Sequence, residues 1–171
     1  MIHINRLTCC GLLLWAAAAA AQQAPAQPDW VEETAPTPPA YSKDALIPID
    51  MPSYVSLQVG IDPVTLSVGK DGVVRYVVVM RNAAGSTTAA FEGIRCTTDE
   101  VKTYARVNAA DHWVILENPE WKPINGNMPS KHAFAIARQG ACDTHLSSSR
   151  EATLKALKQR QKAGSQPAIY Q

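Results

Sequence analysis

The segment Val73–Arg81 is the clearest candidate for a β-strand in the sequence. Five of its residues are valines, and β-branched residues favour strands. Because successive side chains of a strand point to opposite faces, the segment would present apolar groups on both sides. One face would carry Val74, Tyr76, Val78 and Met80, and the other Val77 and Val79. We therefore expect a central strand that is covered on both faces.

Neighbouring segments also have strand patterns, and turns separate them. Residues 69–72, Gly-Lys-Asp-Gly, predict a hairpin turn because glycine adopts the positive φ that such turns need. Residues 82–86 predict the next turn. Further strands are expected at residues 54–59, 64–68, 87–96, 101–107 and 113–116.

Two helices are expected after these strands. Ser130 can cap a short helix over residues 131–139, which Gly140 would end. Ser148 and Glu151 form a capping box for a helix over residues 149–163, which Gly164 would end. Hairpins followed by helices predict an α+β domain, with a small antiparallel β-sheet of five or six strands and two C-terminal helices.

Residues 1–21 have the features of a secretory signal peptide. Arg6 precedes an uncharged apolar stretch, and Ala19 and Ala21 fit the small-x-small rule for cleavage. We expect cleavage after Ala21; an uncleaved N-terminal anchor is the alternative. A lipid on Cys9 or Cys10 is not expected, because both precede the apolar core of this segment. No other segment approaches the ~20 apolar residues of a membrane-spanning helix, so the mature chain is expected to have no transmembrane span.

The rest of the chain divides into three regions. Residues 22–50 form a Pro-rich acidic linker, residues 51–163 the α+β domain, and residues 164–171 a C-terminal tail. The linker is expected to be an extended tether in which only Trp30, Val31 and Tyr41 dock on a folded surface. The whole chain has a net charge of +1, and cleavage would remove the positive charge of Arg6. A neutral mature chain gives no electrostatic reason to bind nucleic acid.

After cleavage, Cys96 and Cys142 are the remaining cysteines. An even pair of cysteines in an oxidising compartment predicts a disulfide bond. Two alternatives stay open. One is a thiol nucleophile with His145 as its base. The other is a zinc site made of both cysteines, His145 and one of His112 or His132.

The sequence predicts no catalytic residue, cofactor site or metal site, and hence no enzyme. It has no Gly-x-Ser-x-Gly motif and no phosphate-binding glycine loop. Trp113 and Trp121 are expected to pack in the core or anchor loops, and stacking on a sugar or peptide is the alternative.

The second helix is expected to have a basic face. Lys155, Lys158 and Lys162 recur at spacings of three and four residues, so they share one side of the helix. We expect an electrostatic contact of this face with the acidic linker or with an anionic envelope surface. A solvated lysine face without a partner is the alternative.

A string of motifs resembles the conserved-neisserial-protein-like family of bacterial envelope proteins. The motifs are Ile-Asp-Pro at 61–63, Leu-Ser-Val-Gly at 66–69, Asp-Gly-Val-Val-Arg-Tyr at 71–76, Phe-Glu-Gly-Ile-Arg-Cys at 91–96 and Trp-Lys-Pro-Ile at 121–124, followed by Cys142. A looser similarity links the same order of strands, turn and cysteine to surface-adhesin protein E-like domains. The resemblance implies an exported envelope protein without an established activity or assigned catalytic residues.

The sequence and the resemblance together predict a function at a general level. We expect a non-enzymatic structural or partner-binding domain, periplasmic or associated with the outer membrane, whose envelope or extracellular partner is unknown. One alternative is an adhesin-like extracellular binding module, and another is a thiol- or metal-dependent hydrolase.

Overall fold

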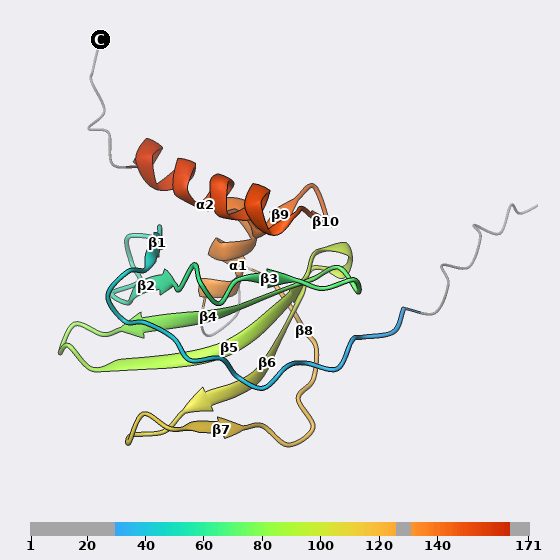
Figure 1. Cartoon of the computed structure of the whole chain (residues 1–171). Helices are drawn as coiled ribbons and strands as arrows, with labels where there is room; N and C mark the ends of the chain where they lie inside the picture. Colours follow the sequence, from blue (N-terminus) through green and yellow to red (C-terminus); the bar gives the residue numbers. More distant parts are fainter. Residues whose placement is uncertain (1–29, 126–130, 165–171) are drawn as a thin grey trace, which may run out of the picture. The chain divides into compact units, whose positions relative to one another are not determined.

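The computed structural model describes residues 30–125 and 131–164, with side chains up to residue 160. Its main feature is an antiparallel sheet in the order β1-β2-β4-β5-β6-β7, in which β3 also pairs with β4 and β8 with β6 (Figure 1). A hairpin of two further strands, β9 and β10, forms a separate small sheet. The strands are β1 (Ile47–Ile49), β2 (Gln58–Ile61), β3 (Ser67–Val68), β4 (Val73–Arg81), β5 (Thr87–Arg95), β6 (Glu100–Val107), β7 (Trp113–Ile115), β8 (Lys122–Pro123), β9 (Cys142–Asp143) and β10 (Leu146–Ser147).

The central strand β4 has both faces covered, as its sequence predicts. It pairs with β5 along its whole length, from Val73 opposite Arg95 to Arg81 opposite Thr87. The side chains of Val74, Tyr76, Val78 and Met80 lie in the larger hydrophobic core, together with residues of the helices. We call this side of the sheet the first face. Val77 and Val79 belong to a second apolar cluster on the opposite side, the second face.

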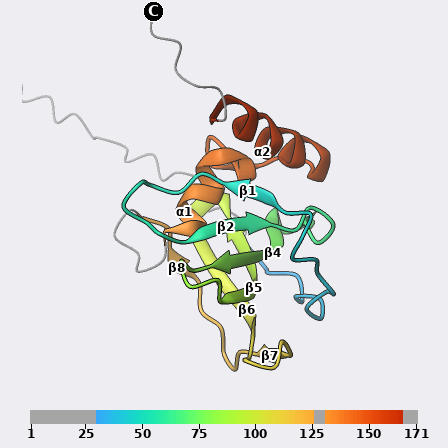
Figure 2. The same ribbon diagram turned by 90° about the vertical axis from the view of Figure 1, so that its left-hand side faces the viewer.

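A helical layer covers the first face (Figure 2). It consists of α1 (His132–Ile136), a π-helical turn over Ala137–Ala141, and α2 (Arg150–Gly164). Ile136 and Leu157 are buried against the sheet. Gly140 has a φ of 143°, and a Cβ at this position would stand 2.6 Å from Cβ of Ala156. Glycine therefore allows α2 to approach the π-helical turn closely.

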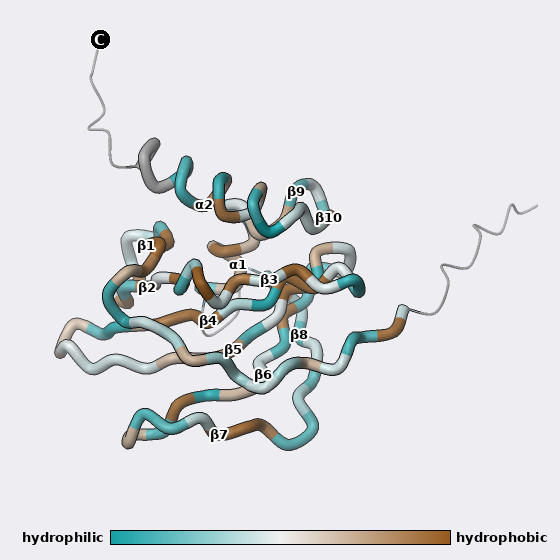
Figure 3. The backbone as a smooth tube through the Cα atoms, viewed as in Figure 1, coloured by the Kyte–Doolittle hydropathy of each residue, from teal (hydrophilic) through white to brown (hydrophobic). Residues whose placement is uncertain are grey.

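The two helices occur where the sequence predicts them, with differences at their ends. The first becomes a π-helical turn after Ile136 and does not continue as an α-helix to residue 139. At the second, the N–H of Ala152 donates to Oγ of Ser149 at 3.2 Å, so the cap is one residue later than the predicted Ser148. The predicted cap at Ser130 lies outside the described residues. Most positions of α2 are hydrophilic, which agrees with its thin apolar stripe (Figure 3).

The second face is covered by residues 31–46, which we call the strap. Ala35, Tyr41 and Leu46 of the strap pack against the apolar cluster of this face, which includes Phe91 and Tyr104. In Figure 1 the strap runs in blue and teal along the sheet. The sequence predicts a tether with isolated docking residues. The structure differs, because polar contacts described below hold much of this segment in place.

The sheet begins within the range predicted as linker and has more strands than predicted. Ile47 and Ile49 of β1 are buried and pair with Ile61 and Val59. The predicted strand at 54–59 is shifted towards its C-terminal end, since β2 starts at Gln58. The additional strands β1, β8, β9 and β10 contain only two or three residues each, too few to produce an alternating pattern. The α+β class is confirmed. Within the described part of the chain, no helix combines the length and apolar character needed to cross a membrane.

Candidate functional site

A cluster of buried polar side chains surrounds Glu92 on the first face of the sheet. The Glu92 residue is only 2% exposed, and His132 only 5%. Oε2 of Glu92 lies 2.8 Å from Nε2 of His132 and accepts a hydrogen bond from the Tyr76 hydroxyl at 3.4 Å. Oε1 accepts a hydrogen bond from Oγ1 of Thr103 at 3.2 Å. Both oxygens of the carboxylate are therefore engaged.

Strand pairing brings these groups together. Glu92 stands opposite Tyr76 in β4 and opposite Thr103 in β6. The register between β5 and β6 shifts next to Glu92, since Phe91 pairs with Ala105 and Tyr104 is left without an opposite residue. Such a bulge redirects side chains. Here it directs Thr103 towards Glu92 while Tyr104 packs on the second face.

The electrostatics of the cluster explain why the Tyr76 hydroxyl is the donor in its hydrogen bond with Glu92. Burial, and then the charge of Glu92, raises the pKa of Tyr76 far above its usual value, so its hydroxyl keeps the proton that it donates. His132 is placed against Glu92 as the first residue of α1. Its other ring nitrogen, Nδ1, is buried without a hydrogen-bond partner among the described residues. Leaving such an atom unsatisfied costs about 1–3 kcal/mol.

Glu92 and His132 line a cavity of about 640 Å³ beside β6, α1 and the loop that follows β7. Apolar and polar groups share this lining. The apolar residues are Val101, Leu116, Pro119 and Ala133, and the charged ones besides Glu92 are Arg106, Glu117, Glu120 and Lys122. The cavity thus combines a buried carboxylate–imidazole pair with surface charges of both signs.

This geometry suits recognition of a polar group better than proton transfer. A general base needs an oxygen within reach of the proton that it removes. Both oxygens of Glu92 already accept hydrogen bonds, and their donors are themselves buried or partly buried. His132 is fixed by Glu92 and offers one nitrogen, Nδ1, that has no partner in the described chain.

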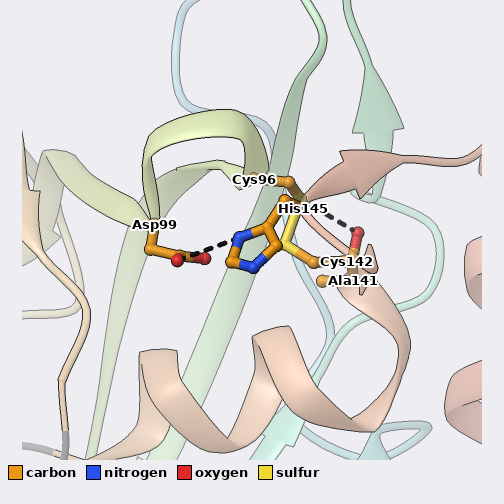
Figure 4. The surroundings of a disulfide bond; sticks show 5 residues. All are labelled: Cys96, Asp99, Ala141, Cys142 and His145. Carbon is orange, nitrogen blue, oxygen red and sulfur yellow. Dashed lines mark hydrogen bonds and ion pairs between the residues drawn. A yellow bond between two sulfur atoms is a disulfide. The ribbon is translucent and has the colours of Figure 1, made fainter.

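The structure contains the disulfide bond expected between Cys96 and Cys142. Their sulfur atoms lie 2.09 Å apart and their Cα atoms 5.5 Å apart (Figure 4). Cys96 follows β5, and Cys142 follows the π-helical turn, so the bond links the sheet to the helical layer. Because the sulfurs are bonded to each other, neither is available as a thiolate. The thiol nucleophile and the zinc site both need one, so neither alternative fits this state.

His145 lies beside this disulfide and contacts a carboxylate that the sequence did not identify as its partner (Figure 4). Its Nδ1 is 3.0 Å from Oδ2 of Asp99, and the two side chains are 69% and 52% exposed. Both residues have a positive φ, 69° for His145 and 51° for Asp99. A polar contact this exposed typically contributes little to stability.

The other histidines considered as zinc ligands lie apart. His132 is buried against Glu92, whereas His112 is exposed in the turn before β7. Across residues 30–125 and 131–164, no three or more His, Cys, Asp or Glu side chains are grouped so that they could hold a metal ion.

Both candidate tryptophans contact the strap. Nε1 of Trp113 donates a hydrogen bond to the carbonyl oxygen of Pro39 at 3.1 Å, and its ring centre lies 5.4 Å from that of Tyr41. Nε1 of Trp121 donates to Oε2 of Glu32 at 3.1 Å. These contacts fit the prediction that the tryptophans anchor loops, since each holds a segment of its own chain.

The acidic residues at the start of the strap bind the second face. Glu32 forms an ion pair with Lys102 at 2.5 Å and accepts a hydrogen bond from the Tyr104 hydroxyl at 2.9 Å. Burial would raise the pKa of Glu32, but the hydrogen bonds from Lys102, Tyr104 and Trp121 outweigh it and lower the value. The N–H of Glu33 donates to Oδ2 of Asp71 at 3.0 Å. The carboxylate of Glu32 thus binds side chains of its own domain.

Among the described side chains of α2, neither Lys155 nor Lys158 forms an ion pair with the strap. Both lysines are exposed. The side chain of Lys162 lies outside the described residues. A contact between this basic face and an anionic surface stays a prediction.

Sequence reasoning did not identify Glu92 or His132 as a pair. One signal was present, because Glu92 is a single acidic residue within the otherwise apolar or small stretch Ala-Ala-Phe-Glu-Gly-Ile at 89–94. A carboxylate there must be buried with a partner or turned outward. The partner is 40 residues away, and no local pattern connects the two.

Comparison with known proteins identifies the family. Residues 25–158 match the CNP1-like family, well over half of the chain. Cryptic neisserial protein 1 of Neisseria gonorrhoeae is 25% identical over 112 residues, a match that covers 58% of this chain and 55% of that protein. The chain thus spans about half the length of this curated relative. No solved structure matches the chain. These findings agree with the resemblance in the sequence, and the chain belongs to the CNP1-like family.

Proposed function

We propose that this chain is an exported protein of the bacterial cell envelope, and that its domain binds a partner and does not catalyse a reaction. Export is supported by the features of residues 1–21 and by the disulfide between Cys96 and Cys142. Disulfides persist in oxidising compartments such as the bacterial periplasm. The CNP1-like family is one of uncharacterised proteins, so the binding role rests on the geometry of the cavity.

The observation that carries the binding role is the way in which Glu92 is held. A carboxylate that is 2% exposed, with hydroxyl groups and an imidazole on its two oxygens, is fixed in position. It can orient His132 against a ligand, but it cannot exchange protons with one unless its own hydrogen bonds break. The cavity therefore favours selective binding.

The lining of the cavity suggests the chemistry of the partner group. The unpaired Nδ1 of His132 can form one hydrogen bond, and the charged side chains at the opening have both signs. A group that carries both a donor and an acceptor, on an envelope molecule or on a partner protein, would match this lining. An ionic group of a single sign would meet repulsion from half of the charges.

Export is tested by fractionating cells that produce the full chain, followed by N-terminal sequencing of the protein. We expect the protein outside the cytoplasm with Gln22 as its first residue, because cleavage after Ala21 fits the small-x-small rule. An intact Met1, or a lipid on Cys9 or Cys10, would contradict this part of the proposal.

The binding role is tested by native mass spectrometry of protein gently extracted from the envelope. We expect an additional bound mass in the unchanged chain and its loss in His132→Gln, which removes the ring that lines the cavity. His112→Gln is the matched control, because His112 is exposed in a turn and does not line the cavity. A turnover activity that depends on Glu92 or His132 would show that the domain is an enzyme and would refute the proposal.

A further inference from the structure

The strand β7 forms one end of the main sheet. It pairs with β6 through Ala105 opposite Ile115, Arg106 opposite Val114 and Val107 opposite Trp113. In both Figure 1 and Figure 2, no other described segment lies beside the outer edge of β7. A sheet edge of this kind presents backbone donors and acceptors to which a further strand can add.

The register shows which backbone groups face outwards. The N–H of Leu116 donates to the carbonyl of Tyr104, and the N–H of Asn108 donates to the carbonyl of His112. Residues that face a partner alternate along an antiparallel strand, so the backbone of Val114 also faces β6. The N–H and C=O groups of Trp113 and Ile115 therefore point away from the sheet.

The side chains at this edge are unusually apolar for an exposed strand. Val114 is 48% exposed and Ile115 is 66% exposed, and Figure 3 colours this part of the chain as hydrophobic. β7 contains neither a charged residue nor a proline, the two features that commonly protect sheet edges. The strand at the other end, β1, contains Pro48 and packs beside α2. The edge at β1 is thus protected against pairing with a further strand, whereas the edge at β7 is not.

We propose that β7 pairs with β7 of a second copy of this chain, in an antiparallel arrangement about a two-fold axis at Val114. This is a surface distinct from the cavity of Glu92, so the inference does not depend on the proposed function. A two-fold axis at Val114 places Trp113 opposite Ile115 of the second copy, and Ile115 opposite its Trp113. These are the residues whose backbone groups face outwards, so the pairing forms four backbone hydrogen bonds.

The side chains support the same register. Val114 faces its own copy across the axis, and each Trp113 faces an Ile115 on the other side of the joined sheet. Pairs of an aromatic and a β-branched residue are favourable in cross-strand positions. Asp111 and Asn118 have positive φ values, 62° and 50°, so the chain turns away at each end and keeps the pairing short. A short pairing without further contacts predicts a weak, reversible dimer.

Sedimentation equilibrium of the full chain tests the association. We expect the average mass to rise from the monomer value towards twice that value as the concentration increases from micromolar to millimolar. Ile115→Pro removes only a donor that faces outwards, and Val114→Lys places two positive charges opposite each other. Both variants should remain at the monomer mass at every concentration, with a melting temperature close to that of the unchanged chain. Val64→Lys, at an apolar residue that is 79% exposed elsewhere, should still associate.

Cysteine cross-linking tests the register. Residues opposite each other between hydrogen-bonded pairs have Cα atoms about 4.5 Å apart, which lies within the reach of a disulfide. In a Cys9→Ser and Cys10→Ser background, Val114→Cys should therefore form a disulfide-linked dimer under oxidation. Ile115→Cys should react at least tenfold more slowly, because the two copies of this residue are diagonal neighbours about 7–8 Å apart. Val64→Cys should not cross-link above background.

Two results would overturn the proposal. The first is a chain that stays monomeric up to millimolar concentration. The second is a Val114→Cys protein that cross-links to a different envelope polypeptide and not to itself, since β7 would then bind another partner.

Discussion

At the scale of single residues, Asp71 and Arg75 form a buried ion pair. Their side chains are 1% and 3% exposed and form an ion pair at 2.7 Å. Burial alone would raise the pKa of Asp71, but hydrogen bonds from Arg75 and from the N–H groups of Val73 and Glu33 outweigh burial and lower it. Arg75 also donates to the carbonyl oxygen of Glu33 at 3.2 Å. The pair therefore stabilises the hairpin before β4 and holds the start of the strap.

We predict that Asp71→Asn lowers the free energy of unfolding by about 3–5 kcal/mol at neutral pH, because it leaves a buried guanidinium without its counter-charge. A carboxyl whose folded pKa is depressed stabilises the fold above its unfolded value of about 4. This contribution is lost as the pH falls through the folded pKa. The unchanged protein should thus lose stability in acid more steeply than the variant does.

Urea unfolding at a series of pH values measures this difference. Asp143→Asn provides the control, because Asp143 is exposed in β9. If the free energy of unfolding fell equally steeply with decreasing pH in the Asp71→Asn variant and in the unchanged protein, this pair would not be the source of the acid-sensitive stability.

The residue scale is also where sequence reasoning was least complete. The disulfide could be predicted because cysteine chemistry restricts the possible partners. Glu92 and His132 have no such restriction, and their contact depends on a bulge in β6 and on the placement of α1. The contact between His145 and Asp99 depends similarly on two positive φ values that no local motif requires.

At the scale of elements, the strap is the clearest departure from the sequence-based prediction. A Pro-rich acidic segment with few large apolar residues usually predicts a tether. Here prolines keep the segment extended, while Glu32 and the backbone of Glu33 bind side chains of the second face. The partners of Glu32 are 70 or more residues away in the sequence, so composition alone does not reveal them.

We predict that Glu32→Ala releases the N-terminal part of the strap. The substitution leaves Lys102, the Tyr104 hydroxyl and Trp121 Nε1 without this acceptor, and we expect a loss of about 1–3 kcal/mol in the free energy of unfolding. Hydrogen exchange should become faster at residues 31–36, and proteases should cut there sooner. Asp44→Ala lies in the same strap and is exposed, so it serves as the control. Unchanged exchange in Glu32→Ala would mean that the apolar contacts of Tyr41 and Leu46 suffice to hold the strap.

The basic face of α2 gives a second prediction for an element. Lys155 and Lys158 are exposed, and helix α2 packs on the sheet through Leu157 with Leu154 partly buried. We predict that the chain beginning at Gln22 binds anionic liposomes weakly at low salt, and that replacing Lys155, Lys158 and Lys162 with Glu abolishes this binding. Sedimentation with liposomes at increasing salt measures the effect. Equal binding of the variant and the unchanged protein at low salt would indicate a solvated face without this role.

The elements that the sequence predicted well are the long ones. Val73–Arg81 is rich in β-branched residues over its length and lies between two predicted turns, so β4 has the same bounds in the sequence and in the structure. The Ser and Gly residues near α2 similarly define its ends to within about a residue. Short strands such as β1 and β8 depend on pairing with other strands and carry no periodic signal of their own.

At the scale of the whole domain, three layers meet at the central sheet. The helical layer covers the first face and the strap covers the second, which explains why β4 could be recognised as apolar on both sides. The helical layer is small, and its buried apolar residues include several alanines. Small side chains bury little apolar area, so packing alone gives this layer limited stability.

The disulfide compensates for this limited packing, and its removal is our last prediction. Cys96 and Cys142 are 46 residues apart, and closing a loop of that length in the unfolded chain corresponds to about 4 kcal/mol in the chain-entropy description. Domains of this size typically have ~5–15 kcal/mol of net stability. Cys96→Ser with Cys142→Ser should therefore lower the melting temperature by roughly 10–20 °C. Calorimetry of the variant and of the unchanged protein, with and without reductant, measures the shift. Reductant should have no further effect on the double variant. If its melting temperature matched that of the oxidised protein, apolar packing alone would account for the attachment of the helices to the sheet.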